Sequence, residues 1–187
     1  MKKGWIILIV IVAVLAIAGL AIGGSYNGLV SKEENVTTQA SNVSTMLQRR
    51  ADLIPNLVNT VKGYAAHEQE AINSVTEARA ALVGAKTIED QSKANDELTG
   101  ALNRLMVIVE NYPDLKANTN FIQLQDELAG TENRIATARK DYNDSVKSYN
   151  TQIKKFPTNI LAGMFGFDEK AYFEADENAN KVPDVNF

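Results

Sequence analysis

Cysteine is absent from the 187-residue chain, and histidine occurs only once. The first absence excludes disulfides, thiolate metal sites and cysteine nucleophiles, and the second excludes most histidine-based zinc and di-iron sites. Proline is rare, with four residues, and aromatic residues make up 7% of the chain. The formal net charge of −4 does not favour nucleic acid as a partner.

The remaining polar residues form no known catalytic motif. No serine lies in a GxSxG or SxxK sequence, and Gly163 and Gly166 lack the preceding strand and following GKS/T of a phosphate-binding loop. His67 lies near Glu68 and Glu70 but without the Glu-x-x-His spacing of a di-iron site, so we interpret it as a surface residue. We therefore expect no catalytic residue, no metal and no cofactor.

The apolar residues are concentrated in one run near the N-terminus. Residues 4–23 have the sequence GWIILIVIVAVLAIAGLAIG, which as a helix spans roughly 30 Å, the hydrocarbon thickness of a bilayer. We interpret this run as an uncleaved transmembrane anchor, and cleavage after the small residues Ala21 and Gly23 is the alternative. Lys2 and Lys3 precede the run and favour a cytoplasmic N-terminus, with the rest of the chain outside.

Gly19 and Gly23 within this run have GxxxG spacing. That spacing allows two transmembrane helices to approach closely. Self-association through these glycines and plain exposure to lipid both stay open.

Beyond residue 25 the apolar residues recur with helical spacing. A seam of positions three and four apart runs from Tyr26 to Tyr64, with Glu33 and Arg50 among its members. Asp52 is suited to cap a new helix that has Pro55 in its first turn, so we expect the first long helix to end there in an antiparallel turn. Because the seam keeps its phase through Pro55, a single kinked helix is the alternative.

Three more helices are expected after that turn. The second runs over residues 53–82 and ends before Gly84, the third over residues 89–112 before Pro113, and the fourth over residues 115–156 before Pro157. The pattern predicts an all-α fold: an N-terminal transmembrane helix followed by an antiparallel up-down bundle of about four long helices. The expected domains are an anchor at 1–24, a bundle at 25–157, an apolar segment at 158–173 and an acidic mobile tail at 174–187.

Several longer motifs occur in a characteristic order. They are YNGLV at 26–30, LQRRADLIPNLV at 47–58, EAR at 77–79, ENYPDLKAN at 110–118, LQDEL at 124–128, TENRIA at 131–136, AR at 138–139, YN at 142–143 and 149–150, and FP at 156–157. Together they resemble the LemA family of bacterial membrane proteins over about residues 24–175. The resemblance implies a single N-terminal transmembrane segment in the bacterial cytoplasmic membrane, followed by a helical bundle, and it implies no catalytic activity.

A first candidate site depends on the expected turn near Asp52. With that turn, the 47–58 and 110–118 motifs meet at the pole of the bundle distal to the membrane. Paired arginines there suit a partner's carboxylates or phosphates, and the structural alternative is a set of caps and ion pairs that hold two turns in register. The residues of this candidate tip are Arg49, Arg50, Asp52, Glu110, Asn111, Tyr112 and Asp114.

The repeated Tyr-Asn dipeptide suggests a second site. Counting rise along antiparallel helices places the three copies near one another at the membrane end of the bundle. We interpret them as an interhelical polar layer, with a small-molecule or peptide site as the alternative. The layer consists of Tyr26, Asn27, Tyr142, Asn143, Tyr149 and Asn150.

The third candidate is the apolar stretch that follows Pro157, which is too short to span a bilayer. Three roles are open: docking on the base of the bundle, contact with a neighbouring subunit, or insertion in the membrane interface. Its candidate contact residues are Ile160, Leu161, Met164, Phe165 and Phe167.

These patterns predict a non-enzymatic protein that works by interaction. We expect a membrane-anchored scaffold, adaptor or self-assembling module at the bacterial cell surface or in the periplasm. A ligand-binding or sensory module that signals through the anchor is the alternative. The expected partners are the lipid bilayer at residues 4–23 and either a second copy of the chain or another membrane protein, with no nucleic acid.

Overall fold

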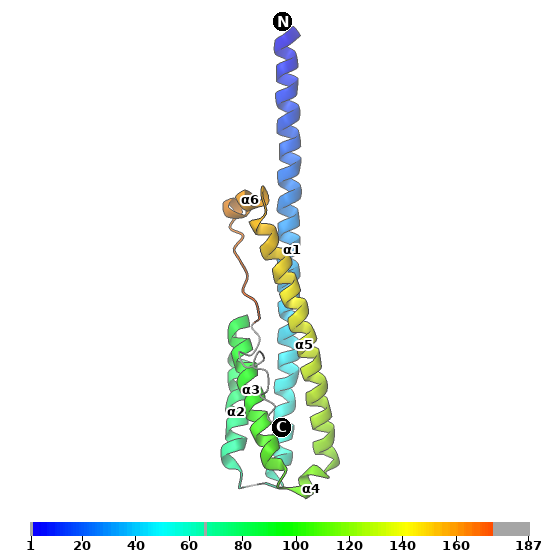
Figure 1. Cartoon of the computed structure of the whole chain (residues 1–187), viewed down its shortest axis with the longest axis vertical. Helices are drawn as coiled ribbons and strands as arrows, with labels where there is room; N and C mark the ends of the chain where they lie inside the picture. Colours follow the sequence, from blue (N-terminus) through cyan, green and yellow to red (C-terminus); the bar gives the residue numbers. More distant parts are fainter. Residues whose placement is uncertain (1, 66, 174–187) are drawn as a thin grey trace, which may run out of the picture. The chain divides into compact units, whose positions relative to one another are not determined.

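The computed structural model describes residues 2–65 and 67–173, and this part of the chain is helical without any strand. The expected all-α fold is therefore confirmed. The expected mobile tail, residues 174–187, lies outside the described residues. The elements, labelled in Figure 1, are α1 (Lys2–Lys62), α2 (Gln69–Gly84), α3 (Ile88–Val109), α4 (Pro113–Lys116), α5 (Thr119–Lys154) and α6 (Thr158–Phe165).

The chain divides into two compact units. Unit 1 consists of Met1–Thr38 and Asp144–Lys170, and unit 2 consists of Gln39–Asn143 and Ala171–Phe187. The boundary after Thr38 falls inside α1 and the boundary after Asn143 falls inside α5, so both helices contribute to both units, while the third boundary, after Lys170, follows α6. The domain boundaries expected at 24 and 157 stay predictions.

Unit 1 contains the apolar run of α1. Among the described helices, α1 is the one long and apolar enough to cross a membrane, and the side chains of its most apolar window are exposed. Leu15 is 65% exposed and Leu20 is 79% exposed. Beyond this run the same helix buries Leu29 and Val36, and α5 buries Val146 and other apolar residues in the same unit.

Unit 2 has an apolar core to which α1, α2, α3 and α5 all contribute. The buried positions of each helix recur at spacings of three, four and seven, as expected for one apolar stripe per helix. Two helix starts are capped: the Thr87 hydroxyl accepts from the Asp90 N–H at 3.1 Å, and the Asn118 side chain accepts from the Phe121 N–H at 3.1 Å. The largest fully buried residues of this unit are Val43, Ile54, Leu57, Ile72, Leu98, Leu105, Leu115, Phe121, Ile135 and Phe173.

The expected helix break at Asp52–Pro55 is wrong. Helix α1 continues through Pro55 to Lys62, and the chain leaves it at Gly63. The second expected helix therefore corresponds to the end of α1 followed by α2. A basic residue in the last turn followed by glycine is a helix-end signal, and Lys62-Gly63 supplies it.

The physical reason lies in the hydrogen bond that Pro55 cannot make. An N–H at position 55 would bond the carbonyl of Ala51, which is fully buried. Arg79 of α2 supplies the missing donor, because its Nε donates to the Ala51 carbonyl oxygen at 2.8 Å. A bond from a neighbouring helix thus offsets part of the cost of proline within α1, and it explains how the helix passes through a residue that normally ends one.

This pairing predicts that the effects of changes at Arg79 and Pro55 are not additive. Arg79→Ala leaves the buried Ala51 carbonyl without a donor, and we expect it to lower the free energy of unfolding by about 2 kcal/mol. In a Pro55→Ala background the restored N–H bonds that carbonyl, so Arg79→Ala should cost clearly less. Chemical denaturation of the four proteins of this double-mutant cycle measures the difference. Equal costs in both backgrounds would contradict the pairing.

Candidate functional site

Arg50 is the centre of a buried polar cluster in unit 2. The residue is 5% exposed, and its Nη1 donates to Asn95 Oδ1 at 2.5 Å and to Thr99 Oγ1 at 3.0 Å. It also forms an ion pair with Glu132 at 2.8 Å, so it links α1, α3 and α5. Burial lowers the pKa of Arg50, and the carboxylates of Glu132 and Asp96 oppose that shift. These contacts give Arg50 a structural role within the bundle.

The neighbouring Arg49 faces solvent. Its Nη2 lies 3.3 Å from Glu127 Oε2 of α5, and the two side chains are 50% and 53% exposed. Asp52, also exposed, accepts from the Gln48 side-chain amide at 2.8 Å. Adjacent positions on α1 thus hold one buried and one exposed guanidinium.

The candidate tip predicted from the sequence does not form as one cluster. Because α1 has no turn at Asp52, that residue lies about 15 Å before the end of the helix. The other expected members of the tip, Glu110, Asn111, Tyr112 and Asp114, lie in the α3–α5 connection. Glu110 forms an ion pair with Lys116 at 2.5 Å, and Asn111 and Asp114 are exposed.

A different set of side chains joins the α1–α2 connection to the α3–α5 connection in unit 2. The Tyr112 hydroxyl donates to Glu68 at 2.7 Å, and the Asn118 amide donates to the Tyr64 hydroxyl at 2.9 Å. The hydrogen bond to Glu68, together with burial, raises the pKa of Tyr112. Tyr64 and Glu68 lie just after the end of α1, in the α1–α2 connection. The Lys62-Gly63 pair is the sequence signal that marks this helix end and therefore the position of both residues.

The two adjacent arginines predict opposite outcomes for the same substitution. Arg50→Ala removes two side-chain hydrogen bonds and an ion pair from a buried position, and we expect it to lower the free energy of unfolding by about 2–3 kcal/mol. Arg49→Ala removes one exposed ion pair and should change it by less than about 1 kcal/mol. Denaturant unfolding of both variants tests this, and equal effects would show that Arg50 is not the structural residue.

In unit 2, the Tyr142-Asn143 dipeptide holds a piece of non-helical chain against α5. The Asn143 side chain donates to the Phe173 carbonyl at 2.9 Å and accepts from the Phe173 N–H at 2.8 Å. The Tyr142 hydroxyl donates to the Ala171 carbonyl at 2.8 Å. Phe173 is 2% exposed, and the Arg139 guanidinium lies 4.4 Å from its ring centre.

In unit 1, Asn150 of the Tyr149-Asn150 dipeptide makes the same pair of backbone hydrogen bonds as Asn143. Asn150 donates to the Lys170 carbonyl at 2.8 Å and accepts from the Lys170 N–H at 3.0 Å. Tyr149 is fully buried, its hydroxyl has no hydrogen-bond partner among the described residues, and burial raises its pKa to about 12. Tyr26 packs edge-on against Phe165 and Phe167, and Asn27 is exposed.

The sequence suggested that the Tyr-Asn dipeptides join two helices, but Asn143 and Asn150 bind backbone groups of non-helical chain instead. The asparagines pair with both backbone groups of one residue, which a side-chain amide can do because it carries a donor and an acceptor. Their partners lie in the segment after α6, whose sequence carries no periodic signal. That is why the expected interhelical layer was assigned the wrong partner.

The two hydrogen bonds between the Asn143 side chain and the Phe173 backbone form a clamp, and replacing the amide by a carboxylate should weaken it. Asn143→Asp keeps an acceptor for the Phe173 N–H but loses the donor to its carbonyl, and we expect a loss of about 1–2 kcal/mol in the free energy of unfolding. The Phe173 amide should also exchange hydrogen faster with solvent. Asn133→Asp, at an exposed position of α5, is the matched control and should alter neither quantity. Unchanged exchange at Phe173 in Asn143→Asp would contradict the clamp.

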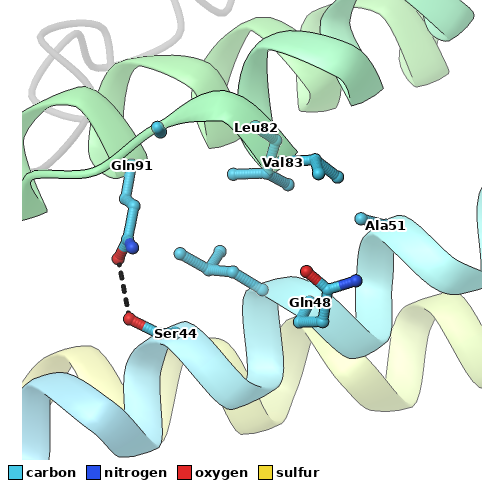
Figure 2. A pocket seen from close by; sticks show the side chains of 8 residues that line it. Ser44, Gln48, Ala51, Leu82, Val83 and Gln91 are labelled. Carbon is cyan, nitrogen blue, oxygen red and sulfur yellow. Dashed lines mark hydrogen bonds between the residues drawn. The ribbon is translucent and has the colours of Figure 1, made fainter.

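A small cavity lies between α1 and the α2–α3 pair in unit 2. Figure 2 shows Leu82, Val83 and Gln91 on one side and Ser44, Gln48 and Ala51 of α1 on the other. The Ser44 hydroxyl donates to Gln91 Oε1 at 3.1 Å across one end. Its volume of about 90 Å³ is below the ~150 Å³ that holds a benzene molecule. The cavity accommodates water-sized molecules, which does not favour a ligand-sensing role.

Two further expectations concern the Gly19–Gly23 pair and metal binding. A side-chain carbon added at Gly19 or Gly23 would meet nothing within 4 Å, so no other part of the chain packs against either glycine. Self-association through these glycines stays a prediction. In the described part of the chain, no group of three or more His, Asp or Glu side chains is placed to hold a metal ion.

A helical bundle that shares a helix with a membrane-length apolar run is the architecture of a membrane-associated helical protein. Comparison with known proteins agrees. The chain belongs to the LemA family, whose model matches residues 39–187. The family resemblance found in the sequence motifs is therefore confirmed.

Individual relatives match over most of this chain. It is 32% identical to the magnetosome protein MamQ of Magnetospirillum gryphiswaldense over 174 residues, 79% of this chain and 64% of that protein. The magnetosome protein MamQ 2 of Paramagnetospirillum magneticum is 31% identical over 175 residues, 80% of this chain and 64% of that protein. The protein LemA of Metamycoplasma hominis is 28% identical over 158 residues, 82% of this chain and 71% of that protein. The chain thus spans less than two thirds of the MamQ proteins.

Proposed function

We propose that this protein is a membrane-anchored adaptor that binds another protein through the outer face of α1 and α5 in unit 2. The carrying observation is an open groove of about 590 Å³ between these helices. Membership of the LemA family and the apolar run of α1 support action at a membrane. In this proposal residues 4–23 cross the bacterial cytoplasmic membrane, with the N-terminus inside because Lys2 and Lys3 precede the run.

The chemistry of the groove suits a polypeptide. Leu53 of α1 and Leu124 of α5 are half-buried and supply an apolar floor. Amide side chains surround them, and each offers both a donor and an acceptor to a partner's backbone or polar side chains. A helix laid into such a groove is a common mode of peptide recognition. The amide and hydroxyl residues of the rim are Asn56, Asn59, Thr60, Asn120 and Gln123.

Charge at one end of the groove adds selectivity. The exposed Arg49–Glu127 pair presents both signs across the two helices, and Glu127 also lines the groove. An exposed pair of this kind contributes little to folding stability, so its charges are available to a partner at low cost. Of the tip residues predicted from the sequence, Arg49 and Asp52 therefore remain candidates for partner binding, whereas Arg50 is engaged within the bundle.

A site-specific crosslinking experiment tests the adaptor role. The chain has no cysteine, so Asn56→Cys carries a single photoreactive label within the groove. Glu97→Cys, exposed on α3, is the matched control outside it. In native membranes we expect a covalent protein adduct from position 56 and none from position 97, and Arg49→Glu should reduce the yield because it reverses the charge at the groove's end.

The mass of the adduct identifies the kind of partner. An addition of 20.4 kDa means that a second copy occupies the groove, and any other protein mass means a different partner. Either result supports the proposal. If position 56 gives no adduct, or if positions 56 and 97 give the same adducts, the groove is not a binding face.

A further inference from the structure

Helix α6 exposes large apolar side chains and buries smaller ones, which is unusual for a helix in water. Its buried positions are Thr158 and the small residue Ala162. Its exposed positions include two large apolar residues, Ile160 at 55% and Met164 at 71% exposure, beside the exposed Asn159 and Gly163. Phe165 at the end of the helix is 51% exposed. A water-exposed helix normally turns such residues inward, so this face is suited to an apolar environment.

Another large apolar side chain is exposed just before the helix. Phe156, which precedes Pro157 and lies outside α6, is 81% exposed, and within the helix Met164 follows Ile160 by four residues. Residues at spacings of four lie on one side of a helix, so Ile160 and Met164 share a face. Lys155, directly before Phe156, is exposed as well. A lysine beside an apolar stripe is typical of helices that lie in a membrane interface, where its ammonium group reaches the lipid phosphates.

Contacts within unit 1 fix α6 at the level where the apolar run of α1 ends. The Tyr26 ring centre lies 5.0 Å from that of Phe165 and 5.7 Å from that of Phe167. Tyr26 follows Gly23, the last residue of the run, by three positions, a rise of about 4.5 Å. Figure 1 shows α6 beside the part of α1 that follows the run.

The chain beyond α6 is held to the same stretch of α1. Gly166 adopts a left-handed conformation with φ 74°, which a residue without a side chain adopts at no steric cost, and it turns the chain back toward α1. Lys170 then forms an ion pair with Glu33 at 2.6 Å. Before α6, Ser148 of α5 accepts from Lys32 Nζ at 2.7 Å. Ser148 before α6 and Lys170 after it are thus both tied to α1 about two turns beyond Tyr26.

We propose that α6 lies in the membrane interface and inserts Ile160 and Met164, together with the flanking Phe156, into the lipid beside the end of the transmembrane run. The bilayer is the occupant because the exposed stripe lies at the level of the run's end, and because a helix of this length cannot span. The inference rests on the proposed insertion of residues 4–23. It gives unit 1 a second membrane contact, parallel to the surface.

Lipid-borne quenchers test this placement in the full-length protein. Single cysteines replace Ile160, Met164, Leu15 or Val107 and carry an environment-sensitive fluorophore, with the protein reconstituted in phosphatidylcholine–phosphatidylglycerol vesicles. Bromine is placed either shallow or deep on the acyl chains. Val107 on α3 of unit 2 is 71% exposed, as Met164 is, and is the matched control. We expect labels at 160 and 164 to be blue-shifted and quenched more by shallow than by deep bromine, Leu15 to be quenched most by deep bromine, and Val107 by neither.

The Leu15 label separates the two proposals. If it is quenched while labels at 160 and 164 are not, the anchor stands and the interfacial helix is wrong. If Leu15 is not quenched either, the membrane insertion on which both depend has failed. A label at 160 or 164 that is blue-shifted but unquenched means that protein covers this face, which also overturns the proposal, and native mass spectrometry then shows whether a second copy does so.

Discussion

The bundle of unit 2 depends on one donor that α1 lacks. Pro55 removes the hydrogen bond that would satisfy the Ala51 carbonyl, and Arg79 of α2 restores it from outside the helix. Because an unpaired buried carbonyl costs about as much as a lost hydrogen bond, the position of α2 and the continuity of α1 are linked. A continuous α1 in turn places Arg50 opposite α3 and α5 rather than at a turn. The polar cluster around Arg50 follows from that placement.

In both units an asparagine side chain of α5 holds the non-helical segment after α6. Asn143 in unit 2 and Asn150 in unit 1 each satisfy both backbone groups of a single residue in the segment after α6. A segment without regular structure has no internal partners for its N–H and C=O groups, so it needs external ones wherever it is buried. The repeated Tyr-Asn dipeptide provides them. The structure thereby explains a sequence repeat that pattern analysis could detect but not assign.

These arrangements leave three kinds of surface for interaction. The apolar run of α1 and the exposed face of α6 are suited to lipid, and the groove between α1 and α5 is suited to a protein. Each is distinct in chemistry: aliphatic in the run, aromatic and aliphatic with a flanking lysine in α6, and amide-rich with a charged pair in the groove. Buried arginine and tyrosine groups, by contrast, contribute to the fold itself. The proposed adaptor role separates structural residues from contact residues in this way.

The sequence by itself determined the helical class, the membrane-length run and most of the core, since these follow from periodicity and from residue type. The seam predicted between Tyr26 and Tyr64 is buried at Leu29, Leu47, Leu57 and other positions. Only the tertiary structure decided where α1 ends and what the asparagines bind. Pro55 is tolerated within α1 because a donor on another helix bonds the carbonyl that proline leaves unpaired. Asn143 and Asn150 bind backbone groups, which every residue carries, so residue type does not identify their partners. Neither leaves a local signal, because both depend on contacts between segments distant in the sequence.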